Sequence, residues 1–374
     1  MKNIVNLGNV ATYINGYAFK PSDWAEDGTP IIRIQDLTGN SYQMNRFKGI
    51  VDSKYDVNSG DVLISWSASL GVYVWNRGNA VLNQHIFKVV FDKEEVDKDF
   101  FVFQIDNLLK RAANQAHGAT MRHLTKPVFD ALPFYLPDIK TQRLISSKLN
   151  LIVHLIEDHH EQLKKLDELI RSRFIEMFGD LINEPKYPGI KLGSLGVMIT
   201  GGTPSRKHDE YYGGNIPFIS TPCLGSNFIS EKNVQNYLTE AGVKNSATHK
   251  IPPYSLMVGN RVGVGKSSIN TCEMCTNQDI LSFVHIDTNR FDLLFLKKVI
   301  DQYSPYFDEH KRGATIQGVP SKVIKDSMVP DVPLEMQKRY TALVKQSDKS
   351  KMAVQKSLDE LETLKKSLMQ TYFG

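Results

Sequence analysis

Residues 139–179 read IKTQRLISSKLNLIVHLIEDHHEQLKKLDELIRSRFIEMFG, and this proline-free stretch decides the fold class. Its apolar residues recur at alternating spacings of four and three, a pattern typical of a long helix with one narrow apolar stripe. A helix of this kind is not stable alone in water, so the pattern predicts a second helix that covers the stripe. The stripe, which has two polar interruptions at His159 and Arg173, consists of Ile145, Leu149, Ile152, Ile156, His159, Leu163, Leu166, Ile170, Arg173 and Met177.

Residues 334–374 supply the candidate partner helix, because they carry the same alternation less cleanly. We expect the two stretches to pair as antiparallel coiled-coil helices, with Asp138 and Asp331 as their N-caps. The alternative is two unrelated amphipathic helices, each packed on its own domain. The second stripe consists of Tyr340, Val344, Ser347, Lys351, Val354, Leu358, Leu361, Lys365, Leu368 and Tyr372.

The chain contains an internal repeat, since short sequence motifs, the landmarks of the repeat, recur in the same order at offsets of 192 to 195 residues. The repeat predicts a duplicated α+β fold with pseudo-twofold symmetry. Its parts are globular segments 1–138 and 180–333, rich in turns and short strands, and helices 139–179 and 334–374. The recurring landmarks are Asn83-Gln84 with Asn277-Gln278, Gly118-Ala119-Thr120 with Gly313-Ala314-Thr315, Leu136-Pro137-Asp138 with Val329-Pro330-Asp331, Gln142 with Gln337, Leu166-Asp167-Glu168-Leu169 with Leu358-Asp359-Glu360-Leu361, and Phe178-Gly179 with Phe373-Gly374.

Composition restricts the class of protein. The chain has 374 residues, 41% hydrophobic and 23% charged, which excludes wholesale disorder. Three cysteines cannot form a disulfide framework, and neither a signal-peptide layout nor a membrane-length apolar run is present, so we expect a cytoplasmic protein without a membrane partner. Basic and acidic residues number 14 and 15 over 1–138 and 16 and 15 over 180–333, so any nucleic-acid binding must rest on local patches.

Three motifs resemble catalytic or metal sites without completing one. Gly263-Val264-Gly265-Lys266-Ser267 lacks the first glycine of a phosphate-binding loop, and Cys272 and Cys275 have no second pair to complete a zinc site. Ile251-Pro252-Pro253-Tyr254 lacks the asparagine that holds the target amine in amino-methyltransferases. We therefore expect a non-catalytic chain that holds no metal and no cofactor of its own.

A duplicated unit suits a ligand with two separated binding stretches, of which duplex DNA is the common case. Polar and basic side chains in the loops are the candidates for DNA contact. Asn83-Gln84 and Asn277-Gln278 recur unchanged, so we interpret them as structural or phosphate-contacting residues. In residues 1–138 the candidates are Tyr17, Lys20, Arg33, Gln35, Ser65, Ser67, Ser69, Arg122 and Lys126. In residues 180–333 they are Thr203, Ser205, Arg206, Lys207, Ser220, Asn260, Arg261, Lys266, Lys311, Arg312 and Lys322.

Several motifs resemble those of type I restriction-modification specificity subunits, in that family's order and along the whole chain. One departure is that the family's Glu-Gln at each helix start is Thr141-Gln142 and Met336-Gln337 here, which leaves the contact of that glutamate in doubt. The motifs are Asn15-Gly16-Tyr17-Ala18-Phe19-Lys20, Gly60-Asp61-Val62-Leu63-Ile64, Gly118-Ala119-Thr120 with His123-Leu124-Thr125, Leu136-Pro137, Thr200-Gly201-Gly202-Thr203-Pro204-Ser205, Tyr212-Gly213-Gly214-Asn215-Ile216-Pro217 and Gly259-Asn260-Arg261-Val262-Gly263.

The resemblance implies that 1–138 and 180–333 are target-recognition domains, each specific for one half of a bipartite, asymmetric DNA site. It implies that the helices act as spacers and dock two methyltransferase subunits that hold S-adenosylmethionine. It also allows two restriction/translocase subunits, with ATP and Mg²⁺ belonging to these partners. Two alternatives stay open from the residues alone: a stand-alone DNA methyltransferase or nuclease, and a coiled-coil scaffold that binds only proteins.

Overall fold

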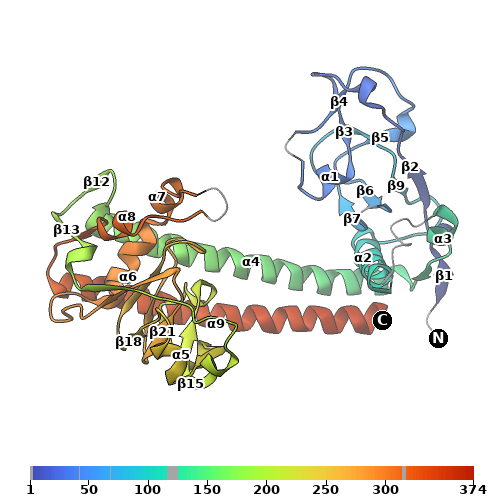
Figure 1. Cartoon of the computed structure of the whole chain (residues 1–374). Coiled ribbons are helices and arrows are strands. Elements are labelled where there is room, and N and C mark those ends of the chain that lie inside the picture. The colour runs from blue at the N-terminus through green and yellow to red at the C-terminus, as the bar shows by residue number, and fades with distance from the viewer. Residues whose placement is uncertain (1–2, 42, 68, 116–124, 314–316) are drawn as a thin grey trace. The chain divides into compact units, whose positions relative to one another are not determined.

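The structure, a computed structural model, describes residues 3–41, 43–67, 69–115, 125–313 and 317–374 (Figure 1). Contacts divide the chain into two compact units. Unit 1 consists of Met1–His160 with Lys356–Gly374, and unit 2 consists of Glu161–Gln355. Each unit therefore combines one globular segment with about half of each long helix. The division into four functional segments stays a prediction.

Unit 1 is built on two four-stranded sheets. The first has the order β2 (Thr12–Asn15), β9 (Ile86–Val90), β6 (Val62–Ser65) and β7 (Gly71–Val74), and its strands are antiparallel. The second has the order β4 (Arg46–Phe47), β3 (Thr29–Ile32), β8 (Ala80–Leu82) and β5 (Asp56–Val57), with β3 and β8 parallel. The unit also contains the pair β1 (Ile4–Asn6) with β10 (Pro133–Tyr135), and the helices α1 (Ile34–Leu37), α2 (Lys98–Gln115) and α3 (Lys126–Asp130).

Unit 2 repeats this topology strand for strand. Its first sheet has the order β14 (Val197–Thr200), β22 (Ile280–Val284), β19 (Leu256–Gly259), β20 (Ser267–Asn270) and β16 (Phe228–Ile229). Its second has the order β17 (Asn236–Leu238), β15 (Tyr212–Ile219), β21 (Met274–Thr276) and β18 (Lys250–Ile251). The pair β13 (Gly189–Lys191) with β23 (Met328–Pro330) matches β1 with β10, while β16 and the hairpin β11 (Gly179–Asp180) with β12 (Glu184–Pro185) are additions. The predicted duplicated α+β fold is confirmed.

Short helices complete both units. In unit 2 these are α5 (Glu240–Lys244), α6 (Leu293–Gln302), α7 (Ser304–Glu309) and α8 (Ser321–Lys325). Single 3-10 turns span Leu7–Asn9, Pro21–Asp23, Ser53–Tyr55, Leu192–Ser194, Asp209–Tyr211, Thr221–Cys223 and Glu231–Asn233.

The two long helices, α4 (Ile139–Phe178) and α9 (Leu334–Phe373), pair antiparallel within each unit. In unit 1, Ile145 shares a core with Phe373, and fourteen residues further along α4 His159 lies 3.0 Å from the Ser357 hydroxyl. In unit 2, Asp167 forms an ion pair with Lys351, and the Tyr340 hydroxyl donates to the Ile170 carbonyl at 3.3 Å. Partner numbers fall as α4 advances, which confirms the antiparallel coiled coil.

The apolar stripe of α9 is buried or half-buried at every predicted position, but the stripe of α4 departs from prediction near its end. Arg173 is exposed and forms an ion pair with Glu176. Phe174 and Phe178 are fully buried instead, and Phe174 packs edge-on against Tyr340 with ring centroids 5.4 Å apart. Arg173 was therefore wrongly assigned to the stripe, because the larger aromatic surface at the next position takes the buried side.

The structure corrects two details of the helix starts and the repeat. The carboxylate of Asp138 accepts from the Thr141 amide at 3.0 Å and from its hydroxyl at 2.6 Å, so this N-cap is confirmed. These bonds hold the pKa of Asp138 below its usual value. Asp331 is not a cap, because α9 begins three residues later and its carboxylate accepts from Arg290. The repeated Leu-Asp-Glu-Leu motif is out of register, since the helices match at an offset of 195 and the motif at 192.

Gln142 and Gln337 occupy the same buried position in the first turns of the two helices. The amide oxygen of Gln337 accepts from the Asp292 amide at 2.9 Å, and its nitrogen donates to the carbonyls of Arg290 and Val332, both at 3.0 Å. Gln142 accepts from the Asp97 amide at 2.9 Å in the same way. Asp97 and Asp292 cap α2 and α6 by accepting from amides three residues ahead. Each glutamine therefore ties a long helix to the globular part of its own unit.

Candidate nucleic-acid interface

Two glycines lie against the backbone of the recurring Asn-Gln pairs. A Cβ on Gly16 would lie 2.0 Å from the Asn83 carbonyl oxygen, and one on Gly201 would lie 2.2 Å from that of Asn277. Only glycine permits this approach of two backbones. The glycine is thus a structural requirement of the same backbone crossing in both units.

Next to this crossing in unit 2, the turn between β19 and β20 forms one wall of an open pocket of about 480 Å³. Three predicted DNA-contacting residues line it: Asn260, Arg261 and Arg312. Gln278, which the sequence analysis interprets as structural or phosphate-contacting, lines it as well. The structure therefore gathers side chains that are separated by up to 52 positions in the sequence.

The backbone of this turn is fixed from two sides. The Asn260 amide donates to the Asp279 carbonyl at 3.0 Å, and the Asn260 carbonyl accepts from the Val319 amide at 2.7 Å. Arg312 and Gly318 exchange two backbone hydrogen bonds, of 2.8 and 2.9 Å, and Gly318 lies directly against Asn260 and Arg261 of the turn. The turn residues are thus held rigidly while their side chains extend into the pocket.

Arg261 is half exposed and lies beside a carboxylate. Its Nη1 atom is 3.7 Å from Oδ1 of Asp279, whose side chain is only 14% exposed. Asp279 in turn accepts from the Asn277 side-chain amide at 3.1 Å. Sequence reasoning missed Asp279, although the change from Asn-Gln-His in the first copy to Asn-Gln-Asp in the second was a visible signal.

The loop after β14 borders the same place. The Thr203 hydroxyl donates to the Gln278 side-chain oxygen at 2.5 Å. Ser205, Arg206 and Lys207 follow it and are exposed. Ser220 is half-buried at the start of a 3-10 turn. The DNA contacts of these residues stay predictions.

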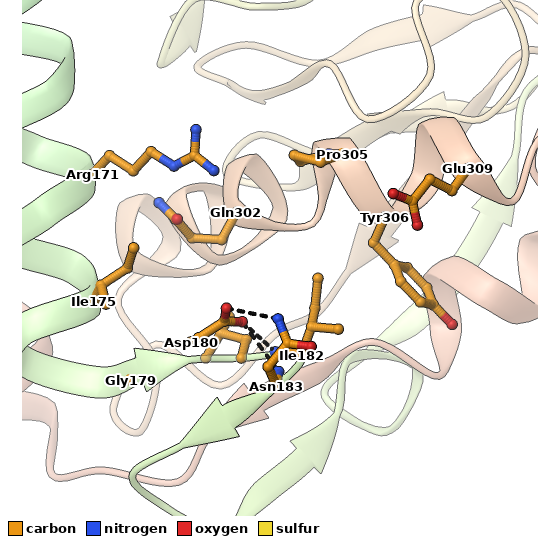
Figure 2. A pocket seen from close by; sticks show the side chains of 11 residues that line it. Arg171, Ile175, Gly179, Asp180, Ile182, Asn183, Gln302, Pro305, Tyr306 and Glu309 are labelled. Carbon is orange, nitrogen blue, oxygen red and sulfur yellow. Dashed lines mark hydrogen bonds between the residues drawn. The ribbon is translucent and has the colours of Figure 1, made fainter.

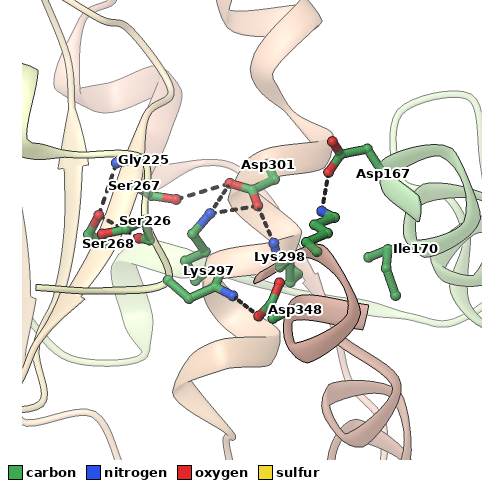
Figure 3. A network of polar contacts seen from close by, with 12 residues as sticks. Asp167, Ile170, Gly225, Ser226, Ser267, Ser268, Lys297, Lys298, Asp301 and Asp348 are labelled. Carbon is green, nitrogen blue, oxygen red and sulfur yellow. Dashed lines mark hydrogen bonds and ion pairs between the residues drawn. The ribbon is translucent and has the colours of Figure 1, made fainter. Parts of the chain in front are cut away.

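Three other candidates of unit 2 lie elsewhere. Lys266 lines a different pocket beside α6, which also contains the polar network drawn in Figure 3. Lys311 forms an ion pair with Asp308, and Lys322 lines a third pocket. The expected cluster of Asn260, Arg261 and Lys266 is therefore divided, because the glycine-rich turn places Lys266 on its far side.

The polar network of Figure 3 centres on a buried lysine. Lys297, 4% exposed in its side chain, donates to both oxygens of Asp301 at 2.9 and 2.8 Å. Ser267 of β20 also donates to Asp301, at 3.3 Å. Desolvation lowers the pKa of Lys297, and Asp301 opposes that effect. The network joins β20 to α6, so its role is to hold the strand and the helix together.

In unit 1 the candidates Tyr17 and Arg33 are set among aromatic rings. Tyr17 is 41% exposed, and its ring lies edge-on to those of Phe19 and Tyr55. The guanidinium of Arg33 is 5.3 Å from the ring centroid of Trp24. Lys20 is exposed and Gln35 is half-buried. These surroundings suit base or phosphate contact without proving it, so all four stay predictions.

The predicted serines of unit 1 require a correction. Ser65 and Ser67 are buried, and the Ser65 hydroxyl donates to the Ser69 carbonyl. Both predictions of DNA contact are wrong for this structure, because Ser65 lies in β6, where every residue is buried, and Ser67, which follows β6, is itself only 5% exposed. Ser69 is exposed and stays a prediction. Lys126 is exposed but forms an ion pair with Asp130, and Arg122 lies outside the described residues.

A separate cavity of about 310 Å³ adjoins the β11–β12 hairpin (Figure 2). Asp180 accepts there from the backbone amides of Ile182 and Asn183 and from the Asn183 side chain, which holds its pKa below the usual value. Its lining includes Arg171, Gln302 and Glu309. The carboxylate is used to close the hairpin, and none of our candidate residues lines this cavity.

Within the described ranges, no group of three or more His, Cys, Asp or Glu side chains could hold a metal ion. Cys275 is buried in β21, and desolvation raises its pKa to about 11, which disfavours the thiolate that metals require. Among those same residues, no helix is long and apolar enough to cross a membrane.

The sequence of the chain is similar to that of known proteins. A family model described as the type I restriction modification DNA specificity domain matches residues 2–168 and 187–363. The chain is 25% identical to the EcoBI specificity subunit of Escherichia coli over 170 residues, which cover 45% of this chain and 35% of the relative. It is 26% identical to the MjaIX specificity subunit of Methanocaldococcus jannaschii over 155 residues, 41% of this chain and 36% of the relative. These matched regions span little more than a third of each relative.

Solved structures resemble the chain over nearly its full length. A chain from a structure of type I R-M complex assembly aligns with a TM-score of 0.65 at 16% identity, covering 99% of this chain and 97% of the other. The S subunit of the type I system from M. genitalium aligns with a TM-score of 0.58 at 13% identity, covering 100% and 96%. At these identities the likeness establishes the fold.

Proposed function

The chain belongs to the type I restriction modification DNA specificity domain family, and we propose that it is the subunit that recognises a bipartite, asymmetric site in duplex DNA. Residues 1–138 and 180–333 act as the two target-recognition domains, one for each half-site. Helices 139–179 and 334–374 act as the spacer between the half-sites. The observation that carries this proposal is the repetition of one topology with different side chains at the same turn.

The turn between β6 and β7 matches the turn between β19 and β20. Trp66 donates its amide to the His85 carbonyl at 3.3 Å, as Asn260 donates to Asp279 at 3.0 Å. The same backbone bond therefore presents Trp66 in unit 1 and Asn260 in unit 2. Two domains of identical topology with different surface chemistry suit two different base sequences.

Catalysis belongs to partner subunits in this proposal. Two methyltransferase subunits supply S-adenosylmethionine-dependent methylation, and two restriction/translocase subunits supply ATP- and Mg²⁺-dependent cleavage. The docking surface for the methyltransferases is on the long helices. Leu169 and Leu364 hold matching positions on α4 and α9 and are 51% and 47% exposed, as a site for two copies of one partner would require.

Methylome sequencing of cells with and without the gene tests the proposal. We expect one bipartite, asymmetric motif to be methylated only when the gene is present. An unchanged methylome in cells that express the partner methyltransferase would contradict the proposal.

Exchange of residues 1–138 for the same segment of a relative tests the division of labour. One half of the methylated motif should change and the other should stay the same, because each domain recognises its own half-site. The reciprocal exchange of residues 180–333 is the matched control. A change in both halves after a single exchange would refute the modular arrangement.

A further inference from the structure

The pocket beside the β19–β20 turn has a direct counterpart in unit 1, and comparison of the two isolates the side chains that differ. Strand pairing matches Ser65 opposite Ile86 with Gly259 opposite Ile280. Trp66, Ser67 and His85 of unit 1 therefore stand where Asn260, Arg261 and Asp279 stand in unit 2.

Unit 1 fills this place with aromatic rings and a buried serine. The Trp66 ring is 5.1 Å from that of His85 and 5.6 Å from that of Phe87, and Ser67 is buried. Unit 2 places a guanidinium and a carboxylate at the positions of Ser67 and His85. The strand pairing and one backbone hydrogen bond are shared and the side-chain chemistry is different, as expected of a position that determines specificity.

We propose that Arg261 recognises a guanine in the half-site of unit 2 and that Asp279 is the positioning residue that orients its guanidinium. The inference rests on the proposed function and names the base and the residues involved. Arginine is the side chain that pairs most often with the O6 and N7 acceptors of guanine in the major groove.

The carboxylate beside Arg261 favours a base over a phosphate. Asp279 Oδ1 lies 3.7 Å from Arg261 Nη1, and a phosphate bound to the same guanidinium would face this negative charge. A guanine edge carries no net charge and suffers no such repulsion. Asp279 also restricts the rotation of a long side chain, which lowers the entropy lost when Arg261 binds a base.

Arg312 is the natural comparison in the same pocket. It is exposed, and within the described residues no ion pair with a carboxylate is found for it. An arginine without a neighbouring carboxylate suits a DNA phosphate, which positions the protein without selecting sequence. The loss of binding caused by replacing Arg261 should therefore depend on the base sequence of the duplex, and the loss caused by replacing Arg312 should not.

The test uses the full chain in complex with its methyltransferase subunits and DNA duplexes that carry the methylated motif. Each base pair of the half-site assigned to unit 2 is replaced in turn. For the wild-type complex, replacing the contacted G·C pair by A·T should weaken binding about 5- to 150-fold, the equivalent of about 1–3 kcal/mol. In Arg261→Ala this discrimination should fall to less than about 2-fold at that pair and persist at the others.

Two further variants separate positioning from folding. Asp279→Asn keeps an acceptor for Asn277 but loses the charge, so it should reduce discrimination at the same base pair, and binding to random DNA should strengthen because less negative charge faces the phosphates. Arg261→Lys keeps the charge but loses the planar fork, so it should behave as Arg261→Ala. Arg312→Ala should weaken binding to all duplexes equally. Replacing the contacted guanine by 7-deazaguanine, which lacks the N7 acceptor, should reproduce part of the loss in wild type only.

The outcomes are distinguishable. A wild-type complex without any sequence preference would overturn the proposed function and this inference together. A selective wild type whose Arg261 variants keep full discrimination at every base pair would overturn the assignment of Arg261 alone. Equal losses on cognate and random DNA would make Arg261 a phosphate contact, and unchanged discrimination in Asp279→Asn would remove Asp279 from the mechanism.

Discussion

Replacement of Gln337 by alanine should destabilise unit 2 far more than its position at a helix start suggests. The side chain is fully buried and takes part in three hydrogen bonds, one accepted from Asp292 and two donated to Arg290 and Val332. Alanine leaves one backbone N–H and two carbonyls without these partners. At about 1–3 kcal/mol for each unsatisfied buried group, the loss is at least about 3 kcal/mol.

Gln337→Met separates hydrogen bonding from packing. Methionine fills a similar volume but neither donates nor accepts strongly, so it should cost nearly as much as alanine. Gln346 lies on the same helix and is exposed, and Gln346→Ala should change the free energy of unfolding by less than about 0.5 kcal/mol. Gln142→Ala should repeat the effect in unit 1, because Gln142 is equally buried and accepts from Asp97.

The measurement must follow each unit separately, because a chain with two units need not unfold in one two-state transition. Hydrogen–deuterium exchange over a urea series, with peptides from α6 for unit 2 and from α2 for unit 1, gives both free energies. Gln337→Ala should lower protection in α6, and Gln142→Ala should lower protection in α2. A loss for Gln337→Ala as small as that of Gln346→Ala would refute the conclusion that this glutamine ties helix to domain.

Two other predictions concern the ionic side chains. Asp301→Ala should destabilise unit 2 by about 3 kcal/mol, because it leaves the buried ammonium of Lys297 without its partner. The double variant Lys297→Met with Asp301→Leu buries no unpaired charge and should therefore lower the unfolding free energy less in the same exchange experiment. Equal losses for the single and double variants would contradict this prediction. Asp138→Asn should make the unfolding free energy of unit 1 depend less steeply on pH in the acid range. The pKa of Asp138 is lowered by its bonds to Thr141, so its contribution to stability is present above about pH 4, the pKa of an unfolded aspartate, and is lost as the pH falls through the folded pKa. An unchanged slope of unfolding free energy between about pH 4 and 2 would refute this prediction.

Periodicity and internal repetition predicted the architecture because both are properties of spacing alone. The helix stripe was correct wherever its residues were the largest apolar groups on their turn, and it failed at Arg173, where Phe174 offered more surface to bury. Asp331 failed as a cap because two additional residues, Val332 and Pro333, delay the start of α9. Local sequence patterns therefore predict the presence of these helices well, and their first and last turns poorly.

The site was harder to predict because residue type does not determine exposure. Ser65 and Ser67 have the chemistry of base-contacting residues, but both side chains are buried, Ser65 in β6 and Ser67 just after it. Lys266 is only five positions from Arg261, but the turn separates the two side chains into different pockets. Gln278 and Asp279 lie beside the turn because they directly precede β22, which pairs with β19, a strand more than twenty positions away in sequence. Such neighbours emerge only from the sheet register.

The duplicated turn explains how one fold can acquire two specificities without losing stability. The amide-to-carbonyl bond that fixes the turn involves only backbone atoms, so it survives the change from Trp66 and His85 to Asn260 and Asp279. Exposed side chains of such a turn can change at a cost of about 0.5 kcal/mol or less. The buried amides of Gln142 and Gln337 cannot, since each forms hydrogen bonds with backbone groups of its own unit that its loss would leave without these partners. Divergence after duplication is therefore cheap at the surface that meets a ligand and costly where helix joins domain, which is the distribution that two different half-sites on one scaffold require.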